Sequence, residues 1–348
     1  MTNQRTIARI LGISQGAVSL GLRGDPSISA GMRKRIKTTA KRLGYCQNVY
    51  VSALMSRIGS GRKVSERGTI ALVVDVLPEK KWREHRTYGA CYEEITRRCA
   101  ELGFGLECFF LQAPGMNAEK IDRIIYARGI PGLILAPPYR SNRVMAIQWN
   151  RYACIGIGYG WEDQQFDRVA NDHHQNTILA CQKLSELGYL RIGLSLPRFL
   201  LEIQSTRWLS GFLTYQYSLP FGRRLPIFHE KPGESSSTRF QEWYRKWRPD
   251  VILSLSGSEK VWLDAMHLTV PGDVGLAALT LNPGSSYSGV KEGTEQLSAT
   301  AVDLVAAQII RNEFGLPSKQ KLTLIEGQWK DGNSLRKAIS IGIRRKKS

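Results

Sequence analysis

Short apolar runs alternate with longer amphipathic segments through residues 69–332, and this alternation constrains the fold more than any other feature. The apolar runs are six to eight residues long, as buried strands are, and they cover 69–76, 106–111, 132–137, 153–159, 190–196, 250–255, 274–279 and 322–327. Segments with a helical pattern lie between most of them, at 88–103, 174–188 and 294–315 among others. Continuous apolar strands separated by helices are typical of parallel sheets covered on both faces. The body is therefore predicted to be α/β and doubly wound, and its length fits two such sheets.

Positive charge is concentrated at the two ends of the chain, whose formal net charge is +19. Residues 1–68 contain 13 Lys or Arg and two acidic residues, and residues 336–348 add six basic residues and no acidic ones. The residues between them are nearly neutral, with 30 basic and 28 acidic side chains. A basic segment joined to a neutral body predicts a phosphate-binding module, as in proteins that bind nucleic acids. We interpret the basic C-terminal tail as a solvated face.

Composition places the chain among globular proteins of two or three domains, with 42% hydrophobic and 23% charged residues. It has no run of 18 apolar residues and no apolar signal core at its N-terminus, so we expect a cytoplasmic protein without membrane contact. The cysteines form no Cys-x-x-Cys pair, and we expect reduced core thiols rather than zinc ligands or disulfides. They are Cys46, Cys91, Cys99, Cys108, Cys154 and Cys181.

The N-terminal segment has the pattern of three short helices. Asn3, Ser14 and Ser29 can each cap a helix, which predicts helices over about 3–11, 15–22 and 29–43. Two short helices joined by a three-residue turn with a glycine, and supported by a third helix, are typical of a helix-turn-helix. The second helix of that motif enters the DNA major groove. Gly16 and Gly21 are poor helix formers, and we interpret these small residues as allowing close approach to DNA.

The stretch from Thr6 to Asn48 resembles the headpiece of the LacI/GalR family of bacterial transcription regulators. The matching positions are Ala8, Gly12, Ser14, Val18, Ser19, Leu22, Ser29, Arg33, Leu43, Gly44, Tyr45 and Asn48. The resemblance implies four parts. They are a helix-turn-helix headpiece over 1–47, a hinge helix and linker over 48–68, a two-lobed effector-binding and dimerisation domain like the periplasmic sugar-binding proteins over 69–332, and a basic tail over 333–348.

By this resemblance, the base-reading pair falls on Gln15 and Gly16, and a further reader falls on Leu20. Gln15 can pair with adenine through two hydrogen bonds, and Ala17 and Leu20 can contact thymine methyl groups, whereas Gly16 reads nothing. For Leu20, packing in the core of the headpiece is the alternative. Contacts with phosphates are expected from Ser14, Ser19, Ser29 and Arg33. For each serine the alternative is a helix cap and nothing more.

Residues 49–56 have the pattern of a short amphipathic helix, and a linker rich in Gly, Ser and charged residues follows. The resemblance implies that this is a hinge helix, which orders on operator DNA after Asn48 and inserts Leu54 into the minor groove. The alternative is that Leu54 makes an ordinary contact between headpiece and body.

Two arguments place an effector at the same loops of the body. Ligands of open α/β sheets bind beyond the carboxyl ends of the strands, and the resemblance implies a cleft between two lobes. Segments 183–194 and 289–305 follow the family pattern closely. The effector is therefore expected near the loops that follow 76, 137, 159, 196, 255 and 279.

The chain departs from the family's sugar-binding pattern at the residues expected to hold the ligand. The effector-anchoring Arg falls on Trp208, with Arg207 one position earlier and expected to face elsewhere; Thr280 and Leu281 replace a pair of Asp residues. Stacking on Trp suits a sugar ring or another planar ligand, and Arg suits an anion. The candidate effector contacts are Trp82, Arg83, His85, Arg86, Trp161, Asp172, His174, Trp208, Thr280 and Glu292. For each of them, filling of the core or of the surface is the alternative.

Motifs for catalysis are missing from the sequence: it has no P-loop, no Gly-x-Gly-x-x-Gly after a strand and no Gly-x-Ser-x-Gly. The pair His173 and His174 lacks a partner at metal-ligand spacing. We therefore expect no enzymatic activity, no cofactor and no metal. The sequence predicts a homodimeric, ligand-responsive transcriptional regulator, a repressor of a palindromic operator with a sugar-related effector. The alternative is a DNA-binding regulator whose body only dimerises and senses no small molecule.

Overall fold

The computed structural model describes most of the chain. The described residues are 4–23, 25, 27–43, 68–75, 86–138, 145–161, 165–197, 205–229, 236–255 and 257–337. Several predictions fall outside them, namely the hinge helix over 49–56, Asn48, Leu54, Trp82, Arg83, His85, Cys46 and the tail beyond Lys337. No helix of the described part is long and apolar enough to cross a membrane.

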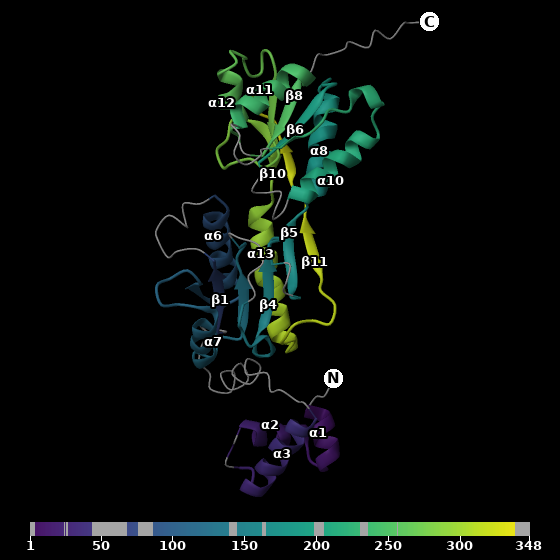
Figure 1. Cartoon of the computed structure of the whole chain (residues 1–348). Helices are drawn as coiled ribbons and strands as arrows, with labels where there is room; N and C mark the ends of the chain where they lie inside the picture. Colours follow the sequence, from purple (N-terminus) through teal and green to yellow (C-terminus); the bar gives the residue numbers. More distant parts are fainter. Residues whose placement is uncertain are drawn as a thin grey trace, which may run out of the picture.

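Three helices form the headpiece, and they confirm the predicted helices to within two residues at their described ends (Figure 1). They are α1 (Gln4–Leu11), α2 (Gln15–Arg23) and α3 (Ala30–Arg42). Their common core is built from Ile7, Ala8, Val18, Ile36 and Ala40, each less than a tenth exposed. This small core comes from all three helices, so each helix depends on the other two for its stability.

Gly21 is buried between α2 and α3, and this position corrects one interpretation of the sequence. A Cβ on Gly21 would lie 2.4 Å from Cδ1 of Ile36, so the missing side chain lets α2 pack closely on α3. A Cβ on the exposed Gly16 would meet only Ser14 Oγ, at 3.8 Å. The expectation that both glycines serve approach to DNA is therefore wrong for Gly21, which lies against Ile36 in the core of the headpiece.

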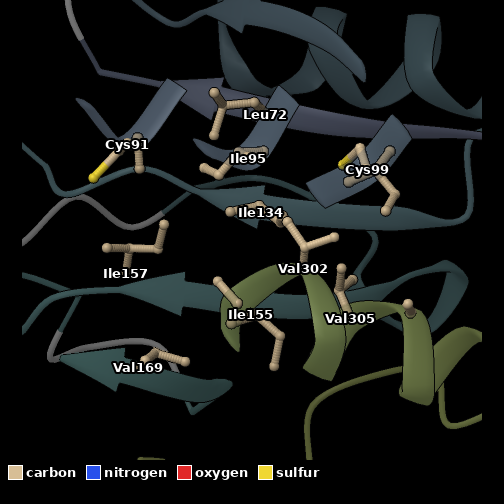
Figure 2. Close-up of a cluster of buried hydrophobic side chains, with 14 of the residues drawn as sticks. Leu72, Cys91, Ile95, Cys99, Ile134, Ile155, Ile157, Val169, Val302 and Val305 are labelled. Atoms are coloured by element: carbon tan, nitrogen blue, oxygen red, sulfur yellow. The ribbon is translucent and has the colours of Figure 1, made fainter. Parts of the chain in front are cut away.

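The first sheet of the body is parallel throughout, with the strand order β11-β5-β4-β3-β1-β2. Its strands are β1 (Thr69–Val74), β2 (Gly105–Phe110), β3 (Gly132–Leu135), β4 (Ala153–Ile157), β5 (Asp167–Asn171) and β11 (Leu322–Ile325). Helices α6 (Arg86–Glu101) and α13 (Thr294–Arg311) cover one face, and α7 (Ala118–Ala127) covers the other. Figure 2 shows side chains of α6 and α13 meeting the strands in the first of these cores. We call this sheet with its helices the first lobe.

The second sheet has the strand order β12-β10-β9-β8-β6-β7 and is parallel except for the pair β10 and β12. Its strands are β6 (Ile192–Leu196), β7 (Phe228–His229), β8 (Val251–Ser254), β9 (Gly275–Ala278), β10 (Ser288–Lys291) and β12 (Gln328–Lys330). Helices α8 (His173–Glu186) and α10 (Ser205–Tyr217) cover one face. Helices α11 (Ser236–Trp247) and α12 (Glu259–Asp264) cover the other. This sheet with its helices is the second lobe, and the two-lobed, doubly wound α/β fold is confirmed.

Each of the eight predicted strands overlaps an observed one, whereas β5, β7, β10 and β12 were not predicted. The sequence of β5 is DRVAN, whose polar residues break the apolar pattern, and β7 is two residues long. Strand β12 lies at the edge of the second sheet and pairs antiparallel with β10, so a prediction of parallel sheets alone omits it.

The chain passes between the two sheets three times, after β5, after β10 and after β11. These crossovers cover 171–173, 291–294 and 325–328 and together form the connection between the lobes. The five cysteines of the described part are free thiols, and burial raises the pKa of Cys91 to about 11. Burial and a raised pKa both suit the predicted core thiols.

Candidate DNA-binding face and interlobe site

Gln15 lies exposed at the start of α2, where the helix-turn-helix motif requires its first base-reading residue. Nε of Arg5 donates a hydrogen bond to Oε1 of Gln15 at 3.2 Å. The amide NH₂ group of Gln15 has no hydrogen-bond partner among the described residues. An exposed amide with a free donor can meet the edge of a base, once Arg5 releases the oxygen.

The other candidate readers also lie at the surface of α2. Gly16 is exposed, and Ala17, Ser19 and Leu20 are half-buried. Leu20 is not part of the apolar cluster that forms the headpiece core, so the alternative role of Leu20 in core packing receives no support.

Two of the serines act as helix caps. Ser14 Oγ accepts a hydrogen bond from the backbone N–H of Ala17 at 3.1 Å, and Ser29 Oγ accepts one from the N–H of Met32 at 3.3 Å. A capping hydroxyl still carries its own hydrogen, which can be donated to a phosphate oxygen. Arg33 Nη1 donates to the backbone oxygen of Asp25 at 3.1 Å and so ties α3 to the loop that follows α2.

Helix α3 is basic along its whole length. It carries six Lys or Arg residues and no acidic one, and its buried residues are Ile36, Thr39 and Ala40. An open hollow on its surface is lined by Ala30, Arg33, Lys34, Lys37 and Thr38. A face with several cations and no carboxylate attracts the phosphates of a nucleic acid.

His173 lies where two of the three crossovers meet. It begins α8 directly after β5, and its Nδ1 lies 3.0 Å from Oε1 of Glu292, which follows β10. The side chains of His173 and Glu292 are 7% and 12% exposed, so this contact is largely shielded from water. The third crossover is joined to the same turn, because Asn176 Oδ1 accepts a hydrogen bond from the N–H of Gly327 at 2.7 Å.

Trp208 stacks on His173, with ring centroids 3.7 Å apart and an interplanar angle of 24°. Gly211 makes this contact possible, because a Cβ on Gly211 would lie 2.4 Å from the backbone oxygen of His174. The close crossing of α10 over α8 at Gly211 brings Trp208, one turn earlier, against the start of α8. Trp208 is 4% exposed and belongs to the core of the second lobe.

Arg207 also faces the place where the crossovers meet around His173, Asn176 and Glu292, which we call the junction. This position corrects the expectation that Arg207 points elsewhere. Its guanidinium carbon lies 3.9 Å from the ring centroid of Tyr159, which follows β4 in the first lobe. Neighbouring residues of a helix are about 100° apart, so Arg207 and Trp208 reach different partners, Tyr159 and His173. These two rings are themselves neighbours, with centroids 5.5 Å apart.

The remaining predicted effector residues are divided between this junction and other places. Asp172 Oδ1 caps α8 by accepting from the N–H of Gln175 at 2.9 Å, and His174 Nδ1 lies 2.9 Å from Ser210 Oγ. Trp161 is elsewhere: it is 1% exposed in the core of the first lobe, and its Nε1 donates to the backbone oxygen of Ala136 at 3.0 Å.

Two further candidates complete that set. Thr280 Oγ1 is buried without a hydrogen-bond partner. Arg86 begins α6, and its side chain lies outside the described part.

Sequence reasoning missed four residues that help to build the junction, namely His173, Tyr159, Asn171 and Asn176. Several polar atoms here are buried and have no hydrogen-bond partner among the described residues: Asn171 Oδ1, Asn176 Nδ2 and Trp208 Nε1. A buried polar atom without a partner is costly, so such a group of atoms indicates a place for water or a ligand. The signal available in the sequence was the position of Tyr159 at the carboxyl end of the apolar run 153–159. In the described part, no group of three or more His, Cys, Asp or Glu side chains could hold a metal ion.

Comparisons with known proteins give relatives of one kind. No protein-family model matches the chain. It is 24% identical over 193 residues to the HTH-type transcriptional regulator CelR of Thermobifida fusca. The matched residues cover 54% of this chain and 53% of the relative. The chain is 26% identical over 220 residues to the HTH-type transcriptional regulator MalR of Streptomyces coelicolor. Here the matched residues cover 61% of this chain and 58% of the relative. The matched stretch thus spans little more than half the length of these relatives.

Solved structures share the fold. A complex of the transcriptional regulator CelR with cellobiose matches with a TM-score of 0.58 at 18% identity, over 96% of this chain and 100% of that one. A lac repressor dimer bound to operator matches with a TM-score of 0.57 at 16% identity, over 96% and 99%. The resemblance to the LacI/GalR family is confirmed, because the curated relatives are HTH-type transcriptional regulators and LacI repressors have the same fold.

Proposed function

We propose that this chain, which resembles the LacI/GalR regulators in sequence and in fold, is a DNA-binding transcriptional repressor controlled by a small-molecule effector. The observation that carries the proposal is the combination, in one chain, of a basic helix-turn-helix with Gln15 exposed at the start of α2 and a two-lobed α/β body. Two solved structures of similar fold support it: one is titled as a regulator–cellobiose complex, the other as a lac repressor dimer bound to operator.

The headpiece supplies the DNA-binding part of the function. Helix α2 enters the major groove with Gln15 and Leu20 toward the bases, and the cations of α3 together with the capped helix starts hold phosphates. Two headpieces of a homodimer then read the two halves of a palindromic operator. The bases are specified by few side chains, since Gly16 offers no side chain to a base.

The lobes supply the part that senses the effector. A ligand at the junction of the crossovers can pair with the buried atoms that lack partners, among them Trp208 Nε1 and Asn176 Nδ2. The neighbouring aromatic rings suit a sugar or another flat ligand. A ligand bound to both lobes changes the angle between them, because they are joined by three short crossovers.

We propose that this lobe angle controls DNA binding through residues 49–56. A helix of about eight residues is unstable alone in water, so this segment folds only when the two hinges of a dimer meet over DNA. Leu54 of each subunit then enters the minor groove as an apolar wedge and bends the duplex. An effector that alters the spacing of the two hinges prevents their folding and weakens binding to the operator.

A second candidate function is a DNA-binding regulator whose body only dimerises. The stack of Trp208 on His173 favours it, since the indole at the position expected to anchor an effector is buried against this chain's own imidazole. Catalysis is not part of either proposal, and the relatives that the chain matches are transcriptional regulators.

Selection of binding sites from random DNA, followed by thermal-shift screening, tests the function. We expect one palindromic sequence to be enriched and a sugar to raise the unfolding temperature, because a saturating ligand stabilises the folded state by RT ln(1 + [L]/Kd). Enrichment of DNA with no stabilisation by sugars or nucleotides would support the second candidate. Enrichment of no sequence would rule out both.

A further inference from the structure

The contact between Arg207 and Tyr159 joins the two lobes at a point outside the crossovers. Tyr159 follows β4 in the first sheet, and Arg207 lies on α10, which packs against the second sheet. The guanidinium carbon of Arg207 lies 3.9 Å from the centroid of the Tyr159 ring. A cation at this distance over an aromatic face is attracted by the ring, more strongly where water is partly excluded.

Both partners are held in place by their own lobes. The hydroxyl of Tyr159 donates a hydrogen bond to the backbone oxygen of Asn171 at 2.7 Å, and Arg168 Nη1 donates to the backbone oxygen of Tyr159 at 3.2 Å. Helix α10 is fixed by its close crossing of α8 at Gly211. The ring is thus fixed within the first lobe and the helix within the second.

Arg207 has no competing partner in the described part of the chain. Its guanidinium forms no ion pair or hydrogen bond with the described residues, and the side chain is half-buried. Among the described residues, the face of Tyr159 is therefore the partner of this cation. The stack of Trp208 on His173 lies next to it, within the second lobe, and the His173 ring is 5.5 Å from the Tyr159 ring.

The position of this contact separates it from the other contacts at the junction. The contact of His173 with Glu292 and the hydrogen bond of Asn176 with Gly327 lie at the crossovers themselves. The contact of Arg207 with Tyr159 joins residues of different lobes that both lie outside the crossover segments, so a rotation that moves α10 relative to β4 alters it. It is therefore a contact that distinguishes one lobe angle from another.

We propose that Arg207 and Tyr159 form an interlobe clasp that holds the observed lobe angle without any effector. The regulatory consequence rests on the proposed function: an effector changes the lobe angle by opening or replacing this clasp. The clasp itself makes no use of DNA or of an effector. It is a ligand-independent interaction, and the ligand-free protein can test it.

Energy transfer between dyes on the two lobes measures the clasp directly. Exposed Glu119 of α7 and Glu242 of α11 suit the dyes, introduced through unnatural amino acids because the chain contains six cysteines. We expect the ligand-free wild type to give one narrow transfer distribution. Arg207→Ala should lose most of this population to a second, broader one.

A matched control removes an equivalent charge without touching the clasp. Lys246 lies over the ring of Trp247 at 5.2 Å within the second lobe, so Lys246→Ala should leave the distribution unchanged. Tyr159→Phe keeps the ring and loses only its hydrogen bond to Asn171, so it should retain most of the wild-type population, whereas Tyr159→Leu should open the lobes. If Arg207→Ala disturbs folding, seen as a changed circular dichroism spectrum, Arg207→Gln replaces it in the same comparison.

The outcomes separate this proposal from the proposed function. A wild-type distribution for both Arg207→Ala and Tyr159→Leu would overturn the clasp, even if the protein binds an operator. Opening of the lobes by these variants supports the clasp, even if no DNA sequence is selected. If the variants open the lobes and no DNA sequence is selected, the proposed function is wrong and the clasp still holds.

Discussion

The indole of Trp208 lies flat on the imidazole of His173, with 3.7 Å between the ring centroids, and the imidazole in turn meets the carboxylate of Glu292. One buried histidine therefore links helix α10 to two of the segments that connect the lobes. Trp208 is at once part of the core of the second lobe and part of the junction where an effector is expected.

Replacing Trp208 should therefore affect stability as well as ligand response. Trp208→Ala removes a buried aromatic side chain, and a loss of about 3–5 kcal/mol in the free energy of unfolding is expected. Trp208→Phe keeps a ring on His173 and should lose much less. Urea unfolding followed by fluorescence measures both, and equal stability of Trp208→Ala and wild type would contradict the packing that we describe.

The two glycines of α2 should respond in opposite ways to the same substitution. Gly21→Ala places a methyl group 2.4 Å from Ile36 Cδ1, and overpacking of this kind costs about 1–3 kcal/mol. Gly16→Ala meets nothing closer than 3.8 Å and should stabilise the helix by up to about 1 kcal/mol. Hydrogen exchange of headpiece amides measures the two effects. Faster exchange in Gly16→Ala than in Gly21→Ala would show that the packing of α2 on α3 is different.

Gln15 should determine one base of each operator half-site. Gln15→Ala removes the amide that can pair with adenine, at a cost of about 1–3 kcal/mol for that contact. Sites selected from random DNA should then vary at one position of each half-site and remain unchanged elsewhere. Arg5→Ala is the informative companion, because it frees the Gln15 oxygen and should keep the base preference. Identical selected sites for Gln15→Ala and wild type would exclude Gln15 as a reader.

Operator affinity should fall steeply with salt, because the segment that binds DNA is basic. Protein that neutralises several phosphates loses roughly 10³-fold or more in affinity between about 50 and 200 mM salt. Lys37→Gln on α3 should lower the slope of log K against log salt by about 1. Lys246→Gln removes a charge from the body and serves as the control. A slope that is near zero for the wild type would count against the headpiece as the DNA-binding module.

Stability should decrease below about pH 6.5, in part through His229. Burial, with a smaller contribution from Arg239, lowers the pKa of His229, and its Nδ1 is buried without a hydrogen-bond partner. The unfolded chain then binds a proton at a higher pH than the folded one, so stability is full above the unfolded pKa and is lost as the pH falls through the folded pKa. Urea midpoints from pH 8 to 5 should fall less steeply for His229→Gln. The exposed His267→Asn is the control, and parallel curves for His229→Gln and wild type would remove His229 as a cause.

Local patterns in the sequence were sufficient for the helices of the headpiece and for eight of the strands. Caps such as Ser29 and continuous apolar runs such as 153–157 act between neighbouring residues, so they can be recognised without knowing the fold. The same reasoning failed for β5, whose DRVAN sequence becomes a strand because β4 and β11 pair with it on both sides. The candidate DNA-binding residues followed from the motif, because a helix-turn-helix is itself a local structure.

The interlobe site was decided by tertiary structure. The sequence placed Trp208 at the effector position, but it gave Arg207 the wrong direction and did not single out Tyr159 or Asn176. These side chains meet because two helices cross at Gly211 and three separate crossovers converge at the start of α8. Periodicity reports which face of an element is buried, and it carries no information about which distant element covers that face. That choice depends on packing across the whole body, and so only the folded chain reveals it.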